Sequence, residues 1–347
     1  PARRQPRRRL FPGGAGMSEE MNTDQPILET RALGKRFSIG TRFSSEGRRV
    51  VHAVDNVSLT VRRGETLGLV GESGCGKSTL ARCLVRLYDI TDGQLLFEGN
   101  DVTSKSLASL RPLRRRLQMV FQDPSASLNP RRRVGDLVAE PLRVHTKLSG
   151  AGIRQRVAEL FELVGLLPDH VVRYPHEFSG GQRQRVGIAR AIALNPDLVV
   201  LDEPVSALDV SVQAQIVNLL ADLQDKLKLT YIFIAHDLSV VRQVSNRIAV
   251  MYLGSIVEEG ASEDVFATPA HPYSQALISA VPVVETTPSG RRKRIILSGD
   301  VPSPLKPPSG CRFHPRCPVA QDRCRTERPA LQEHKTGRKV ACHFPTI

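Results

Sequence analysis

Residues 71–79 read GESGCGKST, and this stretch decides the fold of the chain. It matches the phosphate-binding loop pattern G-x-x-x-x-G-K-[ST] at every fixed position. An apolar run of strand type, residues 65–70, comes before it, and residues 80–87 are expected to form a helix. A Gly- and Ser-rich turn can match such a pattern by chance, but here the strand, the loop and the helix follow in the order that the motif requires. The stretch therefore predicts a nucleotide site.

The residue types of this loop suit the binding of phosphate. Glycines let the backbone fold around phosphate oxygens with its N–H groups inward, and the start of the helix adds positive potential. Lys77 is expected to reach the β- and γ-phosphates, and the Ser78 hydroxyl to ligate Mg²⁺. The predicted nucleotide cradle consists of Gly71, Glu72, Ser73, Gly74, Cys75, Gly76, Lys77, Ser78 and Thr79.

The length and composition limit the classes of protein to which the chain can belong. The 347 residues suffice for one large or two modest domains with a substantial core. No apolar run approaches the roughly 20 residues of a membrane-spanning helix, so the chain is expected to be soluble by itself. Residues 1–26 are rich in Arg, Pro and Gly and lack the apolar stretch of a secretory signal. We expect a disordered basic tail, in which Met17 or Met21 is a candidate natural start.

A net charge of +14 raises the question of a nucleic-acid or anionic-membrane partner. Much of the charge lies in two short clusters, residues 3–9 and 291–294, and in arginines scattered over residues 111–133. Few aromatic residues lie among them to stack on bases. We interpret the clusters as solvated tails and loops, with proximity to acidic lipid as a weaker alternative, and we expect no nucleic-acid partner.

The apolar pattern along the chain predicts an α/β fold. Strand-like segments at residues 27–38 and 51–61 flank a polar loop, and Asp92-Gly93 is a turn signal before a further strand. Past Gly260 the composition shifts towards Pro, Ser and Cys, which indicates an appended C-terminal region. The remaining expected elements are strands at 94–97, 117–121, 198–201 and 231–235, amphipathic helices over 153–164 and 212–223, and a hairpin at 247–258.

A second stretch, LVVLDEP at residues 198–204, places two carboxylates at the end of a buried strand. Ligands of open α/β sheets gather at the carboxyl ends of strands. Asp202 is suited to hold Mg²⁺, directly or through a water, and Glu203 to orient and deprotonate the water that attacks the γ-phosphorus. Such a pair alone is also common as a solvated turn, but the phosphate loop makes the catalytic interpretation dominant.

A third stretch, FSGGQRQRV at residues 178–186, places Ser-Gly-Gly at the start of a helix that is expected to run to Leu194. Ser179 alone would be an ordinary N-cap. An N-cap alone does not require the two glycines. Because glycine has no side chain, they leave backbone N–H groups uncovered at the positive end of the helix. The stretch predicts a second anion cradle, which one nucleotide in a single chain cannot easily fill together with the first.

These motifs resemble those of the ATP-binding subunits of ABC transporters over residues 27–260. One departure from the family pattern is Phe178, where the family more often has Leu. The resemblance implies a phosphate-loop NTPase core of ABC type, with a helical subdomain that carries the signature and an antiparallel β subdomain. The motifs follow in the family order: the phosphate loop, Gln122 in VFQDP, the FSGGQ signature, LVVLDEP, Ser206-Ala207-Leu208-Asp209, and His236 in IAHD.

The resemblance also implies a head-to-tail dimer of ATPase subunits, identical copies or siblings. In such a dimer the signature of one subunit and the phosphate loop of the other clamp the same ATP. Gln122 would sense Mg²⁺ and the attacking water and contact a membrane subunit, and His236 would hydrogen-bond the γ-phosphate. Ser206 and Asp209 would carry signals across the dimer. The signature residues that would bind the partner's nucleotide are Ser179, Gly180, Gly181 and Gln182.

The sequence does not decide which residue stacks on the adenine. The family places an aromatic residue upstream of the phosphate loop, and Phe37, Phe43 and His52 are the candidates here.

The six cysteines divide into two groups. Cys75 lies in the phosphate loop at a helix start, where thiolate is favoured, although a role as small filler is the simpler interpretation; Cys83 is expected to be buried. The other four follow C-x5-C-x6-C-x17-C near the end. ATP hydrolysis places the chain in the reducing cytosol, which disfavours disulfides. From the spacing of Cys311, Cys317, Cys324 and Cys342, zinc, an iron–sulfur cluster and unligated thiols are equally compatible.

The segment at residues 262–282, with His271-Pro272-Tyr273, and GCRFHPRCP at residues 310–318 resemble the C-terminal extension of oligopeptide and dipeptide importer ATPases. The resemblance assigns residues 261–347 to that extension and implies that Cys311, Cys317, Cys324 and Cys342 hold a structural [4Fe–4S] cluster. It implies a peripheral ATPase at the cytoplasmic face of the cell membrane, with two permease subunits and an extracytoplasmic substrate-binding protein as partners. Nickel or another small solute is an alternative cargo, and a soluble ABC ATPase acting on nucleic acid is a weaker alternative.

Overall fold

The structure is a computed structural model that describes residues 25–40, 49–281, 294–334 and 337–346. The expected basic tail lies almost entirely outside these ranges. So do the middle of the polar loop between the first two strands, including Phe43, and the basic residues 291–293.

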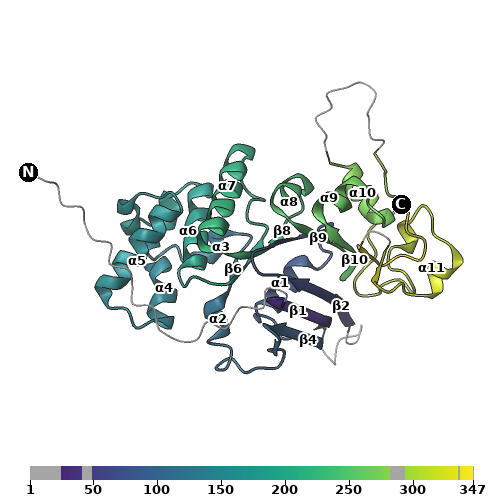
Figure 1. The fold of residues 1–347 in the computed structure, drawn as a ribbon, viewed down its shortest axis with the longest axis horizontal. Coiled ribbons are helices and arrows are strands. Elements are labelled where there is room, and N and C mark those ends of the chain that lie inside the picture. Colours follow the sequence, from purple (N-terminus) through teal and green to yellow (C-terminus); the bar gives the residue numbers. More distant parts are fainter. Residues whose placement is uncertain (1–24, 41–48, 282–293, 335–336, 347) are drawn as a thin grey trace, which may run out of the picture.

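A mixed sheet of eight strands runs through the middle of the molecule (Figure 1). Its order is β11-β12-β10-β9-β3-β8-β7-β6, and the neighbours from β9 to β6 are parallel, whereas the pairs from β9 to β11 are antiparallel. The expected parallel strands and the closing hairpin are confirmed. The strands are β3 (Thr66–Val70), β6 (Leu117–Val120), β7 (Leu198–Asp202), β8 (Thr230–Ile234), β9 (Arg247–Tyr252), β10 (Ser255–Ala261), β11 (Gln332–Glu333) and β12 (Lys339–Val340).

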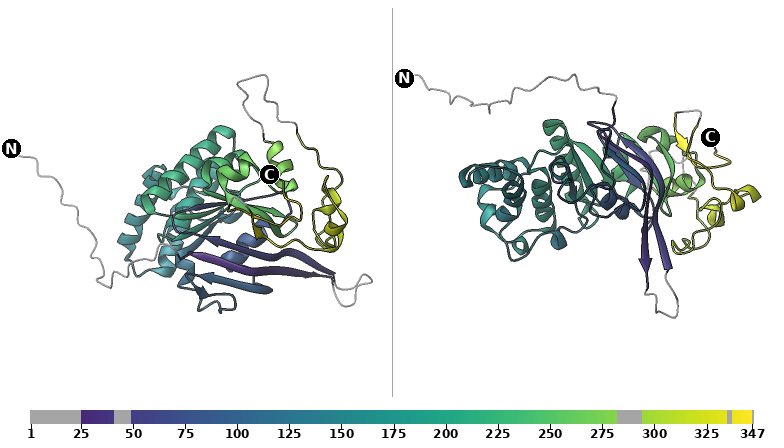
Figure 2. Two further views of the ribbon diagram at one scale, coloured as in Figure 1. Left: turned by 45° about the vertical axis from the view of Figure 1, so that its right-hand side comes forward. Right: turned by 90° about the horizontal axis from the view of Figure 1, so that it is seen from below.

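A second, antiparallel sheet covers one face of the first (Figure 2). Its order is β2-β1-β4-β5, from β1 (Leu28–Ile39), β2 (Arg49–Val61), β4 (Asp92–Phe97) and β5 (Asn100–Asp101). Helix α1 (Lys77–Leu84) lies between the two sheets and contacts β1, β2 and β7. Its apolar side chains Leu80, Ala81 and Leu84 are buried there, so the helix that follows the phosphate loop is held by both sheets.

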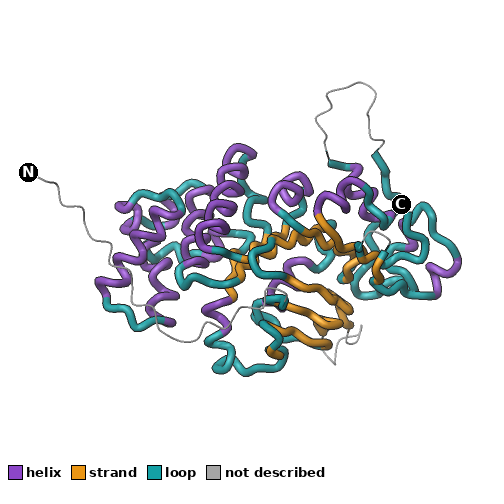
Figure 3. The backbone as a smooth tube through the Cα atoms, in the orientation of Figure 1, coloured by secondary structure: helices purple, strands orange, loops and turns teal. Residues whose placement is uncertain are grey.

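Helices cover the opposite face of the central sheet (Figure 3). Beyond the β6 edge a helical region is formed by α4, α5 and α6, and α6 also contacts α3, α7 and β6. The helices of this face are α3 (Pro124–Ser127), α4 (Val134–His145), α5 (Gly150–Leu163), α6 (Gly180–Ile192), α7 (Val210–Leu227) and α8 (Leu238–Val244), with short 3-10 turns η1 (Pro168–Val172) and η2 (Pro175–Glu177). Helix α2 (Leu113–Arg116), before β6, lies on the other side (Figure 1), where Leu113 packs against the core shared by α1 and the antiparallel sheet.

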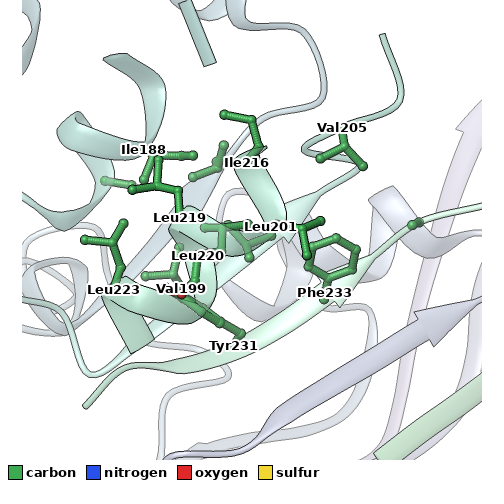
Figure 4. Close-up of a cluster of buried hydrophobic side chains, with 14 of the residues drawn as sticks. Ile188, Val199, Leu201, Val205, Ile216, Leu219, Leu220, Leu223, Tyr231 and Phe233 are labelled. Carbon is green, nitrogen blue, oxygen red and sulfur yellow. Dashed lines mark hydrogen bonds between the residues drawn. The ribbon is translucent and has the colours of Figure 1, made fainter. Parts of the chain in front are cut away.

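The parallel strands are buried on both faces, which explains their continuous apolar sequences. In β7, Val199 and Leu201 pack against α6 and α7, as Figure 4 shows, whereas Leu198 and Val200 face α1 and the antiparallel sheet. Successive strand residues point to opposite faces, so a strand covered on both sides needs apolar residues at every position.

The C-terminal extension joins the edge of the central sheet that lies farthest from the helical region (Figure 1). Strand β12 pairs with β10, opposing Val340 to Glu258, and the N–H of Ala341 donates to the carbonyl of Val257 at 2.8 Å. The other elements of the extension are α9 (Ser262–Ala267), α10 (Pro272–Ser279), η3 (His314–Arg316) and α11 (Asp322–Thr326). Across the described ranges, no helix has both the length and the apolar character needed to cross a bilayer.

Two local predictions are wrong in their boundaries. The helix after the phosphate loop begins at Lys77 and ends at Leu84 rather than spanning 80–87, because Gly76 with φ 108° turns the backbone directly into the helix. Asp92 and Gly93, expected as a turn, are the first residues of β4, where Gly93 takes φ 77° at an irregular pairing with β1.

The buried carboxylate of Glu258 generates a test of how firmly the extension is attached. It accepts hydrogen bonds from the N–H groups of Ala270 and His271, both at 2.9 Å, and lies 3.6 Å from the buried guanidinium of Arg338. Glu258→Ala leaves both N–H groups without this acceptor, so we expect a loss of about 3–5 kcal/mol of unfolding free energy, measured by urea unfolding with circular dichroism. Glu263→Ala, at an exposed ion pair, should change it by less than about 0.5 kcal/mol; equal losses in the two variants would contradict this assignment.

Candidate nucleotide site

The phosphate loop connects β3 to α1 and is closely surrounded by backbone. A Cβ on Gly76 would lie 2.2 Å from the carbonyl oxygen of Ala53, and a Cβ on Gly71 would lie 2.2 Å from that of Met251. Both glycines also have positive φ angles, 108° and 154°. Only glycine fits at these two positions, so the loop can curl between the antiparallel sheet and the β9–β10 hairpin.

The Lys77 side chain is buried within the loop. Its Nζ donates to the carbonyl oxygens of Gly71 at 2.7 Å and Glu72 at 3.0 Å. The ammonium is therefore already positioned at the phosphate loop. When a polyphosphate binds, its oxygens would replace these two carbonyl oxygens as the acceptors of the Lys77 ammonium.

A cavity of about 360 Å³ opens over the loop. This volume suits a small-molecule ligand. Phe37 and His52 line it, so two of the three adenine candidates face this cavity. Pro304, which the sequence analysis did not single out, lines it too. The remaining lining residues are Val51, Ala53, Ser73, Gly74, Cys75, Gly76, Lys77, Ser78, Thr79, Gln122, Glu203, Leu253 and Gly254.

Asp202 and Ser78 form the part of the site that suits Mg²⁺. The Ser78 hydroxyl donates to Asp202 Oδ1 at 2.9 Å. Burial raises the pKa of Asp202, although the hydrogen bond from Ser78 opposes this effect. The second carboxylate oxygen, Oδ2, is buried and has no hydrogen-bond partner among the described residues. A buried oxygen without a partner beside a hydroxyl fits a hard cation that takes oxygen ligands.

Two candidate catalytic side chains, Gln122 and His236, approach the carboxylate of a third, Glu203. Gln122 Nε2 donates to Glu203 Oε2 at 2.9 Å, and His236 Nδ1 lies 3.5 Å from the same oxygen. Glu203 itself has φ 48°, a left-handed conformation that is costly for a non-glycine residue and clusters at functional sites. Gln122, Glu203 and His236 follow β6, β7 and β8, which are adjacent in the sheet. The structure thus brings together residues that the sequence named separately.

The signature residues lie at the start of α6. Ser179 Oγ accepts from Gln182 N at 3.3 Å, and Gln182 Oε1 accepts from Ser179 N at 3.0 Å, which forms a capping box. A Cβ on Gly181 would lie 2.4 Å from Val212 Cγ1, so a larger residue where α6 meets α7 would require the Val212 side chain to move. Ser179 and Gly180 are exposed, and Asp209 is exposed at the start of α7. None of these residues lines the cavity over the chain's own phosphate loop.

The structure corrects one expectation about Cys75. The helix start was expected to favour its thiolate, but burial raises the pKa of the thiol and outweighs Lys77 Nζ, which lies 3.8 Å from Sγ. Its role as a small buried filler is the interpretation that fits. Cys83 is fully buried, as expected, and burial raises its pKa to about 11.

The four C-terminal cysteines line one pocket, together with His271, His314 and other residues of the extension. Burial raises the pKa of Cys311, Cys317 and Cys342, the last to about 11, and repulsion from neighbouring thiolates adds to the rise. Within the described ranges, no three His, Cys, Asp or Glu side chains lie in an arrangement that could hold a metal ion. The sequence analysis predicted that these four cysteines share one site. The identity of the ligand that they hold is a proposal.

Contacts between the extension and the phosphate loop were missed from the sequence. The Arg316 guanidinium donates to both carboxylate oxygens of Glu72, and the Glu72 N–H donates to the Tyr273 hydroxyl. Tyr273 and Arg316 do belong to the quoted HPY and HPRC stretches, but nothing in those stretches indicates what they contact.

Comparisons with known proteins identify the family and the fold. A family model described as ABC transporter matches residues 54–206, and one described as the C-terminal region of oligopeptide/dipeptide transporters matches residues 257–324. Among solved structures, dimeric MJ0796, an ATP-binding cassette bound to ADP and Pi, has a TM-score of 0.62 at 28% identity and covers 68% of this chain and 99% of its own. The cbiO1 protein of *Clostridium perfringens*, part of the cbiONQ transporter complex, has a TM-score of 0.60 at 29% identity, covering 70% and 92%.

The fold and the site define the class of this protein as an ATP-binding cassette ATPase. Curated relatives narrow the class. The oligopeptide transport ATP-binding protein AppF of *Bacillus subtilis* is 51% identical over 92% of this chain and 98% of its own. The dipeptide transport ATP-binding protein DppF of *Haemophilus influenzae* is 47% identical over 94% and 99%. The chain belongs to the family of oligopeptide and dipeptide ABC transporter ATP-binding proteins.

The raised pKa of Cys75 generates a labelling prediction. Only the thiolate reacts with iodoacetamide, so alkylation should be slow near pH 7 and should rise about tenfold per pH unit while the pH stays below the thiol pKa. Mg²⁺-ATP should protect Cys75, and alkylated protein should bind no nucleotide. The measurement is peptide mapping by mass spectrometry, with Cys83, fully buried elsewhere, as the internal control. Fast labelling at pH 7 or full nucleotide binding after labelling would show the assignment to be wrong.

Proposed function

We propose that this chain hydrolyses ATP to drive the import of di- or oligopeptides through a membrane ABC transporter. The observation that carries the proposal is the convergence of Gln122, Glu203 and His236 beside the phosphate-loop cavity, with Ser78 and Asp202 next to it. These groups supply what phosphoryl transfer to water requires: a phosphate cradle, oxygen ligands for Mg²⁺ and a base near the attacking water.

In this mechanism each residue has a separate task. Ser78, Asp202 and Gln122 would hold Mg²⁺, and the bound ion would supply positive charge against the β- and γ-phosphates. Lys77 binds the same phosphates. Glu203 orients the attacking water and accepts its proton, and His236 holds the γ-phosphate and that water in line. The hydrogen bond from Gln122 to Glu203 keeps the base directed towards the cavity.

Two subunits complete each site in the proposal. Ser179 and Gly180 are exposed, and the capped helix start formed by Ser179, Gly180, Gly181 and Gln182 lies away from the chain's own cavity, so this helix start is available to a γ-phosphate bound by a partner. Val210, beside Asp209, is 82% exposed, which suits a residue that a partner covers. The related MJ0796 cassette, described as dimeric with ADP and Pi, supports this arrangement.

A groove next to Gln122 is the proposed docking place of a permease. It has a volume of about 410 Å³ and is lined by β6, α3, α4 and α6. The apolar side chains of Leu87, Phe121 and Val144 are 50%, 38% and 50% exposed along it. A short amphipathic segment of a membrane subunit would cover these side chains. Because Phe121 precedes Gln122, docking and hydrolysis would be linked. The chain would then be a peripheral subunit at the cytoplasmic face of the cell membrane, with two permeases and a substrate-binding protein.

The cargo is assigned through the relatives. Those with about half of their residues identical are named for oligopeptide or dipeptide transport. An ATPase subunit does not contact the cargo, so nickel or another small solute is an alternative cargo. Binding of peptides by the partner substrate-binding protein would reject this alternative.

The four-cysteine pocket is proposed to hold a [4Fe–4S] cluster. Four thiols around one cavity match the ligand number of such a cluster. Each iron takes its own thiolate, so the four sulfurs need not meet at one point, as they must around a single zinc ion. Burial keeps the pKa of three of the thiols high, and bound iron would offset that cost by deprotonating them.

Glu203→Gln tests the assignment of the base. It keeps the size and most hydrogen bonds of the side chain but cannot accept the proton, so phosphate release should fall about 100- to 10,000-fold with ATP affinity retained. The measurements are phosphate release by the assembled transporter and equilibrium binding of ATP. The control is Glu159→Gln, the same carboxylate-to-carboxamide change at an exposed side chain on α5. It should leave both phosphate release and ATP affinity unchanged. Undiminished phosphate release in Glu203→Gln would reject Glu203 as the base.

Metal analysis tests the cysteine site. Protein purified without oxygen should be brown, with a broad absorption in the visible blue and about four iron and four sulfide per chain. Cys317→Ala should lose the colour and the iron, whereas Cys83→Ala, outside the pocket, should keep them. Stoichiometric zinc without iron would overturn the proposal.

A further inference from the structure

The phosphate loop is held by the C-terminal extension as well as by the ATPase core. Arg316 binds the Glu72 carboxylate through two parallel hydrogen bonds, Nη1 to Oε2 at 2.8 Å and Nη2 to Oε1 at 3.1 Å. The backbone N–H of Glu72 donates to the hydroxyl of Tyr273 at 2.9 Å. A bidentate guanidinium–carboxylate pair fixes orientation as well as distance. Two side chains of the extension therefore hold Glu72, one at its carboxylate and one at its main chain.

The position of Glu72 matters for nucleotide binding in two ways. Its carbonyl oxygen accepts from Lys77 Nζ at 3.0 Å, so a shift of Glu72 would move the lysine that meets the phosphates. Its carboxylate also places a negative charge in a loop that binds a polyanion. The charge is only 27% exposed, so water screens it weakly, and Arg316, at 8%, neutralises it directly.

Buried aromatic rings connect these contacts to the cysteine-bearing segment. Phe313 packs edge-on against Tyr252 at a centroid distance of 5.2 Å, and Tyr252 packs against Tyr273 at 4.7 Å. All three rings are at most 1% exposed. Phe313 and Arg316 lie in the short stretch between Cys311 and Cys317, which the turn η3 shapes. The segment that lines the four-cysteine pocket thus also places the guanidinium on the phosphate loop.

We propose that Arg316 and Tyr273 are positioning residues of the ATP site, so that the affinity for nucleotide depends on the C-terminal extension. They keep the phosphate loop in its binding conformation and neutralise the carboxylate of Glu72. The inference rests on the proposed ATP site and extends it to two residues that touch no reacting atom. Because coupling between two sites is reciprocal, bound nucleotide would in turn stabilise the contacts of Arg316 with the loop.

The test is a double-mutant cycle on the full chain, with Mg²⁺ and a non-hydrolysable ATP analogue in equilibrium binding. Arg316→Ala leaves the Glu72 charge facing the phosphates, so affinity should fall about tenfold. Glu72→Gln removes that charge, and the affinity of this variant is the reference for the second arm of the cycle. Adding Arg316→Ala to Glu72→Gln should then cost less than about twofold, because nothing is left to neutralise. In the assembled transporter, Arg316→Ala should raise the KM for ATP with kcat nearly unchanged.

The matched control is Arg328→Ala. Arg328 also belongs to the extension and binds the core, through Asp55 at 2.7 Å and the Ser255 hydroxyl at 2.8 Å, but it does not contact the phosphate loop. Its loss should leave affinity unchanged. Equal affinities in Arg316→Ala and Arg328→Ala, or an equal fall caused by Arg316→Ala with and without Glu72→Gln, would overturn the inference.

Two further variants keep the test decisive if Arg316→Ala does not fold. Arg316→Lys keeps the charge but not the bidentate geometry, and Tyr273→Phe keeps the buried ring but removes the acceptor for Glu72 N–H. Each should weaken binding about threefold; wild-type affinity in both would reject the inference. Lys77→Ala separates the two proposals. If Lys77→Ala retains wild-type affinity for the ATP analogue, the proposed ATP site is wrong. If Lys77→Ala loses binding while the Arg316 and Tyr273 variants bind normally, only the role of the extension is rejected.

Discussion

The close approach of backbone to the phosphate loop is the constraint on which the rest of the structure depends. At Gly76 the loop touches the Ala53 carbonyl of the antiparallel sheet, and at Gly71 it touches the Met251 carbonyl of the central sheet. The loop can keep its N–H groups directed towards a ligand only if both sheets hold these positions. The antiparallel sheet is therefore part of the nucleotide site, since β2 forms one wall of the cavity and restrains the loop at the same time.

Sheet topology explains why three dispersed motifs form one site. Strands β6, β7 and β8 are parallel neighbours, so their carboxyl ends lie at the same edge, and Gln122, Glu203 and His236 follow them there. The left-handed backbone of Glu203 is supported by the hydrogen bond from its N–H to the Ile234 carbonyl at 2.9 Å. Neighbouring strands thus stabilise the strained residue that we propose as the base.

The extension is connected to the core at several points. Strand β12 continues the central sheet, Glu258 of β10 accepts hydrogen bonds from the start of the extension, and Arg328 binds Asp55 of β2. These contacts fix the extension against β2 and against the same β9–β10 hairpin that meets the phosphate loop. A rigid attachment is what allows Arg316, on a segment with little regular structure of its own, to reach Glu72 with two good hydrogen bonds.

The sequence alone determined the phosphate loop, the strand that ends in Asp202-Glu203 and the capped signature helix, because each is a local pattern whose residues act within a few positions of one another. Tertiary structure decided what depends on distant partners. Glu72 and Arg316 are 244 residues apart and Gln122 and Glu203 are 81 apart, so only the folded sheets and their connections bring them together. The same reason explains the error at Cys75, where a helix start favours the thiolate locally but the surrounding chain removes the water that would stabilise it.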